Sequence, residues 1–198
     1  MGQEAGRMEK LSGAEVKLSK KIACILRHKP ESAGQTMDKH GWVSVSELIK
    51  ALPTDMEMLE KIVTLNEKKR FIFSEDKSRI RACQGHTIEV DVELKEAVPP
   101  KYLFHGTLLK NREHMEKEGL RPMKRLYVHL SADIDTAWQV AKRRKSAEGY
   151  MIYHIDTDAM IKSGCKFYQA ENGVWLTKIV PPSCMEEIRC ESADMEMK

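Results

Sequence analysis

The sequence predicts an α+β protein built from two lobes that join near residue 97. Its 198 residues are enough for two domains of about 100 residues each. Helical spacing and then strand alternation fill the first half, whereas short apolar runs and helical stretches alternate in the second. Between them, "EAVPP" at 96–100 has the composition of a stiff linker. The expected segments are a disordered tail at 1–12, a first lobe at 13–96, a second lobe at 97–188 and a tail at 189–198.

The first lobe is expected to begin with a helix over residues 15–28. Its apolar residues keep roughly helical spacing, and Pro30 stops the helix. These apolar residues are Val16, Ile22, Ile25 and Leu26. A short extended piece is expected at Trp42–Val43.

Two N-cap signals predict a second and a third helix. Ser44 with Glu47 forms a capping box, and Thr54 with Glu57 repeats the signal. The third helix would bury Met58, Leu59, Ile62, Val63 and Leu65. "RFIFSEDKSRIRA" then alternates, turns at 75–78 and alternates again, which is typical of a hairpin. Three helices followed by a hairpin is the order of a winged-helix module.

The second lobe has a different pattern. Five short apolar runs predict strands, namely "YLFH", "LYVHL", "MIYHI", "KFYQA" and "VWLT". Two helical stretches lie between them, near 108–118 and 133–144. This interleaving predicts an α+β lobe with several short strands.

Composition limits the classes of function. The chain is 41% hydrophobic and 32% charged with a net charge of +3, so an anion site has to be built locally rather than by a general basic surface. No apolar stretch reaches the roughly 18 residues of a membrane span. The cysteines are odd in number and widely spread, which predicts reduced thiols; they are Cys24, Cys83, Cys165, Cys184 and Cys190. We expect a cytoplasmic protein without a membrane partner.

The candidate residues for chemistry are mostly basic, because GxSxG, HExxH, P-loop and GxGxxG motifs are absent. Arg27 and His28 close the first helix, where cations either cap the helix dipole or bind an anion. Arg79 and Arg81 share one side of a strand, as solvated hairpin residues or as anion ligands. Arg143 lies in "AKRRK", a charge run typical of an exposed helix face. If these groups converge, planar arginine forks could hold a phosphate by two-point contacts.

Two further candidates follow apolar strands in the second lobe. They are the triplets His105-Gly106-Thr107 and His129-Leu130-Ser131. Polar groups at strand ends are suited to ligand contacts, although a histidine there can equally be a core residue with a satisfied hydrogen bond. The pattern alone leaves both interpretations open.

Six blocks together resemble the RNA 2′-phosphotransferases, the KptA-like enzymes named after a step of tRNA splicing. The blocks are "SKKIACILRHKPE", "GWVSVSELI", "RIRACQGH", "YLFHGT", "YVHLS" and "FYQAENGVWLTKIVPP". They follow the family's order over about residues 18–182, and the ordered set is specific although each block is weak alone. The resemblance implies an N-terminal winged-helix lobe that takes RNA and a C-terminal lobe akin to ADP-ribosyltransferases that takes NAD⁺.

The resemblance also implies a reaction in two steps. An internal RNA 2′-phosphate attacks the anomeric carbon of the nicotinamide ribose and expels nicotinamide. The neighbouring ribose 2″-hydroxyl then attacks the phosphorus and frees the RNA 2′-hydroxyl. The products are 2′-OH RNA, nicotinamide and ADP-ribose 1″,2″-cyclic phosphate.

Residue roles follow from the matching blocks. The family's catalytic residues fall on Arg27, His28, Arg81 and Arg143. Its NAD⁺ contacts fall on His105, Gly106, Thr107, His129, Leu130 and Ser131. Arg79, His86 and Lys29 are expected to contact the RNA or its phosphate.

One block departs from the pattern, because the family usually has Val-Gly-x-Arg-His-Gly where this chain has "VAKRRK" at 140–145. Whether Arg143 or Arg144 faces the phosphate is therefore open, and the register favours Arg143.

This chemistry needs neither a general base in its first step nor a metal ion. A phosphate monoester has a second pKa of about 6 and is already an anionic nucleophile near neutral pH. Arginines can stabilise charge on phosphorus oxygens, and His28 could supply the proton for the leaving RNA oxygen because a histidine pKa is about 6.5. We expect NAD⁺ as co-substrate and no metal.

Two other functions stay open from the sequence. A winged-helix nucleic-acid-binding protein without enzymatic activity would leave "YLFHGT" and "VHLS" without a role. An ADP-ribosyltransferase acting on protein or on terminal nucleic-acid phosphates would leave ADP-ribose on its acceptor. If the chain is instead an RNA 2′-phosphotransferase, we expect a monomer whose partners are NAD⁺ and a tRNA-like RNA with an internal 2′-phosphate.

Overall fold

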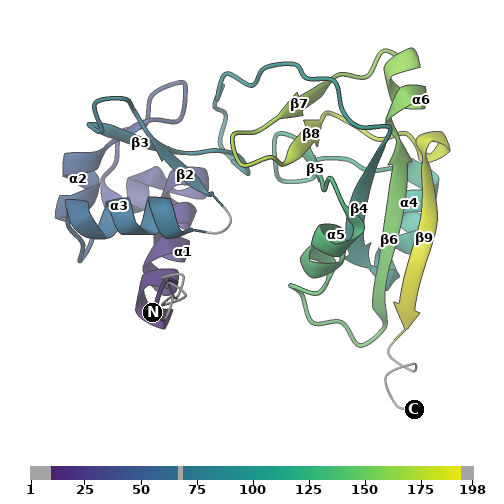
Figure 1. Ribbon diagram of the computed structural model, residues 1–198, viewed down its shortest axis with the longest axis horizontal. Coiled ribbons are helices and arrows are strands. Elements are labelled where there is room, and N and C mark those ends of the chain that lie inside the picture. Colours follow the sequence, from purple (N-terminus) through teal and green to yellow (C-terminus); the bar gives the residue numbers. More distant parts are fainter. Residues whose placement is uncertain (1–9, 67–68, 193–198) are drawn as a thin grey trace, which may run out of the picture. The chain divides into compact units, whose positions relative to one another are not determined.

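The computed structural model describes residues 10–66 and 69–192, and it confirms the α+β class (Figure 1). The chain divides into two compact units, Met1–Glu93 (unit 1) and Leu94–Lys198 (unit 2). The division falls a few residues before the linker predicted at 96–100. Among the described residues, no helix is long and apolar enough to cross a membrane.

The described part of unit 1, residues 10–66 and 69–93, has three α-helices followed by a hairpin, in the predicted order. The helices are α1 (Gly13–His28), α2 (Val45–Ala51) and α3 (Met56–Leu65), with a 3-10 helix η1 (Pro30–Ala33) after α1. The strands β1 (Val43–Ser44), β2 (Phe71–Phe73) and β3 (Arg79–Ala82) form one antiparallel sheet in the order β1-β3-β2. The predicted hairpin is confirmed, and the assignment to the winged-helix fold stays a prediction.

Capping side chains set the helix starts in unit 1. Ser12 and Glu15 form a complete capping box, so α1 begins earlier than the predicted residue 15. Ser44 caps α2 as predicted, and its hydroxyl accepts from a backbone amide at 3.4 Å. The predicted Thr54 cap is wrong. Asp55 caps α3 and accepts from an amide at 2.8 Å, because an ionised carboxylate is favoured at a helix N-terminus.

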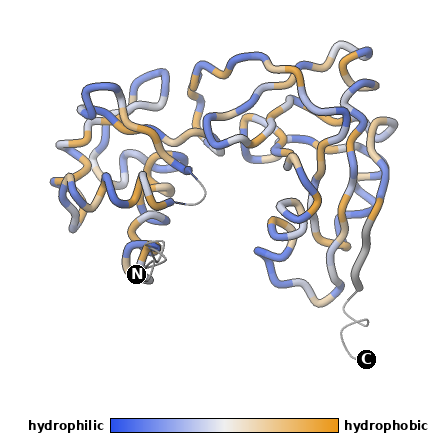
Figure 2. The backbone as a smooth tube through the Cα atoms, viewed as in Figure 1, coloured by the Kyte–Doolittle hydropathy of each residue, from blue (hydrophilic) through white to orange (hydrophobic). Residues whose placement is uncertain are grey.

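The core of unit 1 lies between its helices and its sheet. Of the predicted apolar face of α1, Ile22, Ile25 and Leu26 are buried and Val16 is half-buried. The three buried residues pack with apolar residues of the other elements, namely Leu48, Leu59, Ile62, Phe71 and Ile80. Figure 2 shows the hydrophobic β2 giving way to the hydrophilic turn at 74–78. This core holds the last turns of α1 against β3.

Within its described residues, 94–192, unit 2 contains two antiparallel three-stranded sheets. The first has the order β4-β6-β9, from β4 (Tyr102–Leu108), β6 (Gly149–Asp156) and β9 (Met185–Ser192). The second has the order β5-β8-β7, from β5 (Val128–Leu130), β8 (Trp175–Thr177) and β7 (Phe167–Gln169). The helices are α4 (Arg112–Glu118), α5 (Ile134–Ala141) and α6 (Thr157–Lys162), with the 3-10 helices η2 (Leu109–Asn111) and η3 (Pro182–Cys184). The five predicted strands are all present.

Unit 2 departs from the prediction in three places. The helix α6 and the strand β9 were not predicted. Strand β9 runs to Ser192, so the tail predicted from 189 begins as a strand whose backbone pairs with β6. The helix predicted over 133–144 ends at Ala141, so Arg143 lies beyond it. Residues 193–198 of the predicted C-terminal tail, and residues 1–9 of the N-terminal one, lie outside the described residues.

Candidate functional site

The C-terminal end of α1 is joined to the segment that follows β3. Arg27 and His28 form the last turn of α1, and Lys29 is its exposed C-cap. The Thr87 amide donates to the Arg27 carbonyl at 3.0 Å, and the Thr87 hydroxyl lies 3.0 Å from Nδ1 of His28. A hydroxyl can donate to or accept from an imidazole nitrogen, so this contact suits either tautomer of His28. Thr87 thus holds both predicted catalytic residues of α1 in place.

Gly85 lets the same segment pass beneath the Arg27 side chain. Its φ of +90° is in the left-handed region that favours glycine. A Cβ at this position would lie 3.6 Å from the guanidinium carbon of Arg27. That distance is an ordinary van der Waals contact, so it is the backbone conformation of this segment that favours glycine at position 85.

His86 is a buried, neutral histidine in this cluster. Only 3% of it is exposed, and burial, followed by the charges of Arg27, His28 and Arg81, lowers the pKa of His86 to about 4. Its Nε2 is buried and has no hydrogen-bond partner among residues 10–66 and 69–192. At neutral pH His86 thus adds no positive charge for a phosphate, and the cations of this cluster are its arginines.

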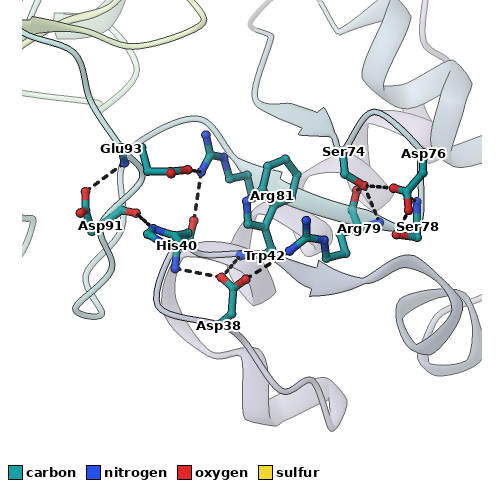
Figure 3. A network of polar contacts seen from close by, with 10 residues as sticks. All are labelled: Asp38, His40, Trp42, Ser74, Asp76, Ser78, Arg79, Arg81, Asp91 and Glu93. Atoms are coloured by element: carbon teal, nitrogen blue, oxygen red, sulfur yellow. Dashed lines mark hydrogen bonds and ion pairs between the residues drawn. The ribbon is translucent and has the colours of Figure 1, made fainter.

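The two hairpin arginines lie on one face of β3, as predicted, and both cover the ring of Trp42 (Figure 3). The guanidinium carbon is 4.5 Å from the ring centre for Arg81 and 5.4 Å for Arg79. Their surroundings differ, because Arg79 is exposed whereas only 8% of Arg81 is. Nη1 of Arg81 donates to the carbonyl of His40 at 3.3 Å and to the carboxylate of Glu93 at 3.1 Å. Arg81 is thus a buried cation with a carboxylate partner.

In unit 2, the two predicted triplets lie side by side where β4 meets the end of β5. Phe104 and Ser131 exchange two backbone hydrogen bonds, at 2.9 and 2.8 Å. Nδ1 of His105 lies 3.2 Å from the carbonyl oxygen of His129. Since a carbonyl only accepts, Nδ1 carries the proton, and Nε2 of a neutral ring is left as an acceptor.

The surroundings of the half-buried His105 ring favour its neutral form. Burial lowers the pKa of His105, the hydrogen bond to the His129 carbonyl opposes this, and the charge of Arg125 lowers the pKa further. A neutral ring with a protonated Nδ1 offers one hydrogen-bond acceptor at a fixed place. That is the kind of group that can bind a hydroxyl.

Gly106 allows α5 to pack directly on β4. A Cβ on Gly106 would lie 1.9 Å from the carbonyl oxygen of Ala137 and 3.1 Å from the Cβ of Ala141, both in α5. The next residue, Thr107, is buried, and its hydroxyl accepts from the amide of Asn111 at 3.0 Å. The "HGT" triplet therefore combines an acceptor, a close helix contact and a hydroxyl.

Arginines gather beside the His129 triplet. Arg143 and Arg144 follow the end of α5 and are exposed, and Nη1 of Arg125 lies 3.4 Å from Nδ1 of His129. Partial desolvation, then the charges of Arg144 and Arg143, lower the pKa of Arg125. Because Arg125 is itself exposed, the crowding of three cations contributes more to this shift than desolvation does. None of the three has a carboxylate within ion-pair distance in the part of the chain that the structure describes.

The structure thus brings the predicted residues together in two groups, one in each unit. In unit 1 they are Arg27, His28, Arg79, Arg81 and His86, with Lys29 exposed beside them. In unit 2 they are His105, Gly106, Thr107, His129, Leu130 and Ser131, and Arg143 follows α5.

Sequence reasoning missed three residues of these groups, Trp42, Thr87 and Arg125. Thr87 and Arg125 could have been found from their places next to "QGH" and ahead of "VHLS". The described residues contain no group of three or more His, Cys, Asp or Glu side chains placed to hold a metal ion.

Comparison with known proteins gives one consistent family. The model of the family described as "RNA 2′-phosphotransferase, Tpt1 / KptA family" matches residues 13–179. A protein of Fusobacterium nucleatum named "Probable RNA 2′-phosphotransferase" is 52% identical over 172 residues, which is 84% of this chain and 95% of that protein. Proteins of the same name from Flavobacterium johnsoniae and Rhizobium johnstonii are each 45% identical, over 85% and 84% of this chain and 94% and 91% of their own.

Proposed function

Because the chain belongs to the RNA 2′-phosphotransferase (Tpt1 / KptA) family, we propose that it is an NAD⁺-dependent RNA 2′-phosphotransferase. It transfers an internal 2′-phosphate from RNA to NAD⁺. The products are 2′-OH RNA, nicotinamide and ADP-ribose 1″,2″-cyclic phosphate. A tRNA-like RNA with a 2′-phosphorylated junction is the proposed substrate.

The observation that carries this proposal is the cationic cluster of unit 1. Arg27, His28 and Arg81 lie close enough for their charges to lower the pKa of the same buried histidine, His86. Arginine forks hold phosphate oxygens by paired, charge-assisted hydrogen bonds. A single RNA phosphate suits this cluster better than a long duplex, because the chain's net charge is only +3.

In the first proposed step, a 2′-phosphate oxygen attacks the anomeric carbon of the nicotinamide ribose. The bond from that carbon to the pyridinium nitrogen breaks, and neutral nicotinamide leaves with the bonding electron pair. The phosphate is already an anion near neutral pH, since its second pKa is about 6. The arginines therefore only need to hold and orient it.

In the second proposed step, the ribose 2″-hydroxyl attacks phosphorus and the bond to the RNA 2′-oxygen breaks. The hydroxyl gives up one proton and the RNA oxygen takes one, so no net proton is needed. His28 is the group proposed to pass this proton, with Thr87 holding its ring at 3.0 Å. Arg81 and Arg143 would stabilise the charge that develops on the phosphorus oxygens.

The proposed NAD⁺ contacts are the paired triplets of unit 2. Nε2 of His105 is an acceptor that could bind a ribose hydroxyl, since Nδ1 is held by the His129 carbonyl. Thr107 and Ser131 add hydroxyl groups, and Gly106 and Leu130 supply backbone beside them. The exposed cations Arg125, Arg143 and Arg144 suit an anionic ligand such as a diphosphate.

One assay tests this function. A short RNA with a single internal 2′-phosphate is incubated with the protein, with and without NAD⁺ and with and without chelator. We expect NAD⁺-dependent loss of the 2′-phosphate and release of ADP-ribose 1″,2″-cyclic phosphate. Chelator should have no effect on the rate, because arginines and not a metal ion are proposed to stabilise the charge. ADP-ribose that stays on the RNA would indicate an ADP-ribosyltransferase instead. A requirement for Mg²⁺ would contradict the arginine mechanism.

A further inference from the structure

The turn that precedes β1 is closed by one carboxylate. Oδ1 of Asp38 accepts hydrogen bonds from the amides of His40, at 2.8 Å, and of Trp42, at 3.0 Å. The Asp38 amide donates to the Trp42 carbonyl at 3.0 Å. Gly41 has a φ of +80° and donates to the Asp38 carbonyl. Residues 38–42 therefore form a turn of fixed shape, drawn in Figure 3.

Strand pairing brings this turn to the hairpin arginines. In the antiparallel pair β1 and β3, Ser44 lies opposite Arg79 and Val43 opposite Ile80. Continuing this register by one residue places Trp42 opposite Arg81. The Trp42 ring is accordingly covered by the guanidinium of Arg81 at 4.5 Å.

The same turn contacts both arginines through its polar atoms. The carbonyl of His40 accepts from Nη1 of Arg81 at 3.3 Å. Oδ2 of Asp38 lies 3.5 Å from Nη1 of Arg79. One five-residue turn thus offers a ring, a carbonyl and a carboxylate to the two arginines.

A ring stacked on arginines can be mere surface packing, but the state of Arg81 argues for more. Arg81 is 8% exposed, and among residues 10–66 and 69–192 its Nε is buried without a hydrogen-bond partner and Glu93 is its single carboxylate partner. Burying a cation while leaving a donor unused is unfavourable for stability alone. An aromatic face restrains the plane of a guanidinium without using any of its N–H groups. The arrangement therefore fixes the guanidinium plane of Arg81 and leaves its Nε donor unpaired within the described residues.

We propose that Trp42 is a positioning residue for phosphate transfer, with Arg81 as the group through which it acts. The ring holds the guanidinium plane of Arg81 ready for the RNA 2′-phosphate, and Asp38 holds the backbone of Trp42 through its amide and carbonyl. This inference rests on the proposed function and extends it to a residue that acts through Arg81 rather than on the phosphate itself. Since Arg81 is assigned to the second step, a change at Trp42 should also affect mainly the second step.

The test is a double-mutant cycle read by the rates of the two steps. Trp42→Leu should slow the second step more than the first by roughly 2- to 30-fold, the range of one cation–π contact, and ADP-ribosylated 2′-phospho-RNA should build up. Trp42→Phe keeps an aromatic face and should recover much of the lost rate. In an Arg81→Ala background, Trp42→Leu should slow the second step much less than it does in the wild type, because only the longer contact with Arg79, at 5.4 Å, is then lost. Independent, multiplicative effects of the two substitutions would overturn the proposal.

A matched control is Tyr127→Leu, which removes an aromatic ring from Lys178, 3.9 Å from the ring centre. Neither residue has an assigned role, so the ratio of the two step rates should not change. If Tyr127→Leu shifted that ratio as Trp42→Leu does, the effect would be general destabilisation and the proposal would fail. Should Trp42→Leu not fold by circular dichroism, Trp42→Phe serves in the same cycle, with a smaller expected defect because Phe is the weaker partner for a cation.

A binding measurement separates failure of this inference from failure of the proposed function. Wild type, Trp42→Leu, Arg81→Ala and the double variant are titrated with RNA that has, or lacks, the 2′-phosphate. Non-additive losses confined to the phosphorylated RNA would support the role of Trp42 even if no NAD⁺-dependent turnover were found. Turnover with additive losses in the cycle would refute the role of Trp42 and leave the function standing.

Discussion

The two units hold their candidate site residues by different means. In unit 2, the histidine triplets are fixed by backbone pairing, because Phe104 and Ser131 exchange two hydrogen bonds and β4 pairs along its whole length with β6. In unit 1, the basic residues are fixed by side chains from separate segments, such as Thr87 on His28 and Trp42 on Arg81. A backbone-held group should be most sensitive to anything that moves a strand or helix. A side-chain-held group should be sensitive to each single contact.

The largest effect is expected where unit 2 has no room for a side chain. Gly106→Ala would place a Cβ 1.9 Å from the Ala137 carbonyl oxygen, so α5 would have to move off β4. We expect a loss of about 3 kcal/mol or more in the free energy of unfolding, since overpacking against backbone cannot relax by a side-chain rotation. Urea denaturation measures this.

Gly13→Ala is the matched control for Gly106→Ala. Gly13 is the first residue of α1, and a Cβ there would meet nothing within 4 Å. Its free energy of unfolding should stay the same or rise slightly, because alanine favours helix. If Gly106→Ala were as stable as this control, the close approach of α5 to β4 would not exist in solution.

The next largest effect concerns pH and the side-chain-held cluster of unit 1. The folded pKa of His86 is about 4, below the ordinary value of about 6.5, so the unfolded chain takes up a proton over this range and the folded chain does not. The stability contributed by neutral His86 is therefore present above pH 6.5 and is lost as pH falls towards 4, by up to about 3 kcal/mol.

Hydrogen exchange of the buried α1 amides measures this loss for unit 1 alone. His86→Gln cannot take up the proton and should show a flatter dependence on pH between 7 and 4. Carboxylates that titrate in the same window are common to both proteins and cancel in the comparison. Equal slopes for wild type and His86→Gln would mean that His86 is not buried as a neutral group.

Much of the secondary structure was predictable because its signals are local. Caps at Ser44 and alternation on both sides of the turn at 75–78 depend on residues close in sequence. The edge strand β9 was missed because "MEEIRCES" carries charges on both faces, and its strand state comes from pairing with β6. The six-residue helix α6 is too short for a periodic pattern.

The candidate site was predictable by residue type and family resemblance but not by contact. Arg81 could be named from "RIRACQGH". Its stacking on Trp42, which lies 39 positions earlier in the sequence, depends on the register of β1 against β3. Neutral His86 was also beyond sequence reasoning, because its pKa depends on burial among distant cations. Such contacts are set by tertiary packing, which local patterns do not contain.

A smaller effect, on rate rather than stability, compares one arginine from each unit. Arg81→Ala and Arg143→Ala should each slow the second chemical step more than the first, by about 10- to 150-fold, the loss of a charge-assisted contact of roughly 1.5–3 kcal/mol. Intermediate should build up as a slower-migrating RNA band in a gel time course. Because Arg143 and Arg144 are both exposed after α5, Arg144→Ala is measured beside the other two variants. A larger defect in Arg144→Ala than in Arg143→Ala would assign the phosphate contact to Arg144. Equal loss of both steps in every variant would refute the assignment of these arginines to the second step.

The smallest effect is expected at the backbone-held hydroxyls of unit 2. Thr107→Val keeps the shape of the side chain and removes its hydroxyl, and Ser131→Ala does the same at the paired triplet. Each should raise the KM for NAD⁺ by about 2- to 13-fold at nearly constant kcat, because a hydrogen bond of roughly 0.5–1.5 kcal/mol would be lost equally from the bound substrate and the transition state. Thr107→Ser retains the group that accepts from Asn111 at 3.0 Å and should stay near the wild-type KM, which separates loss of the hydroxyl from disturbance of β4. Initial rates at varied NAD⁺ and saturating RNA measure the effect. An unchanged KM for NAD⁺ in both Thr107→Val and Ser131→Ala would remove the co-substrate from these triplets, and the backbone bridge between Phe104 and Ser131 would then be structural only.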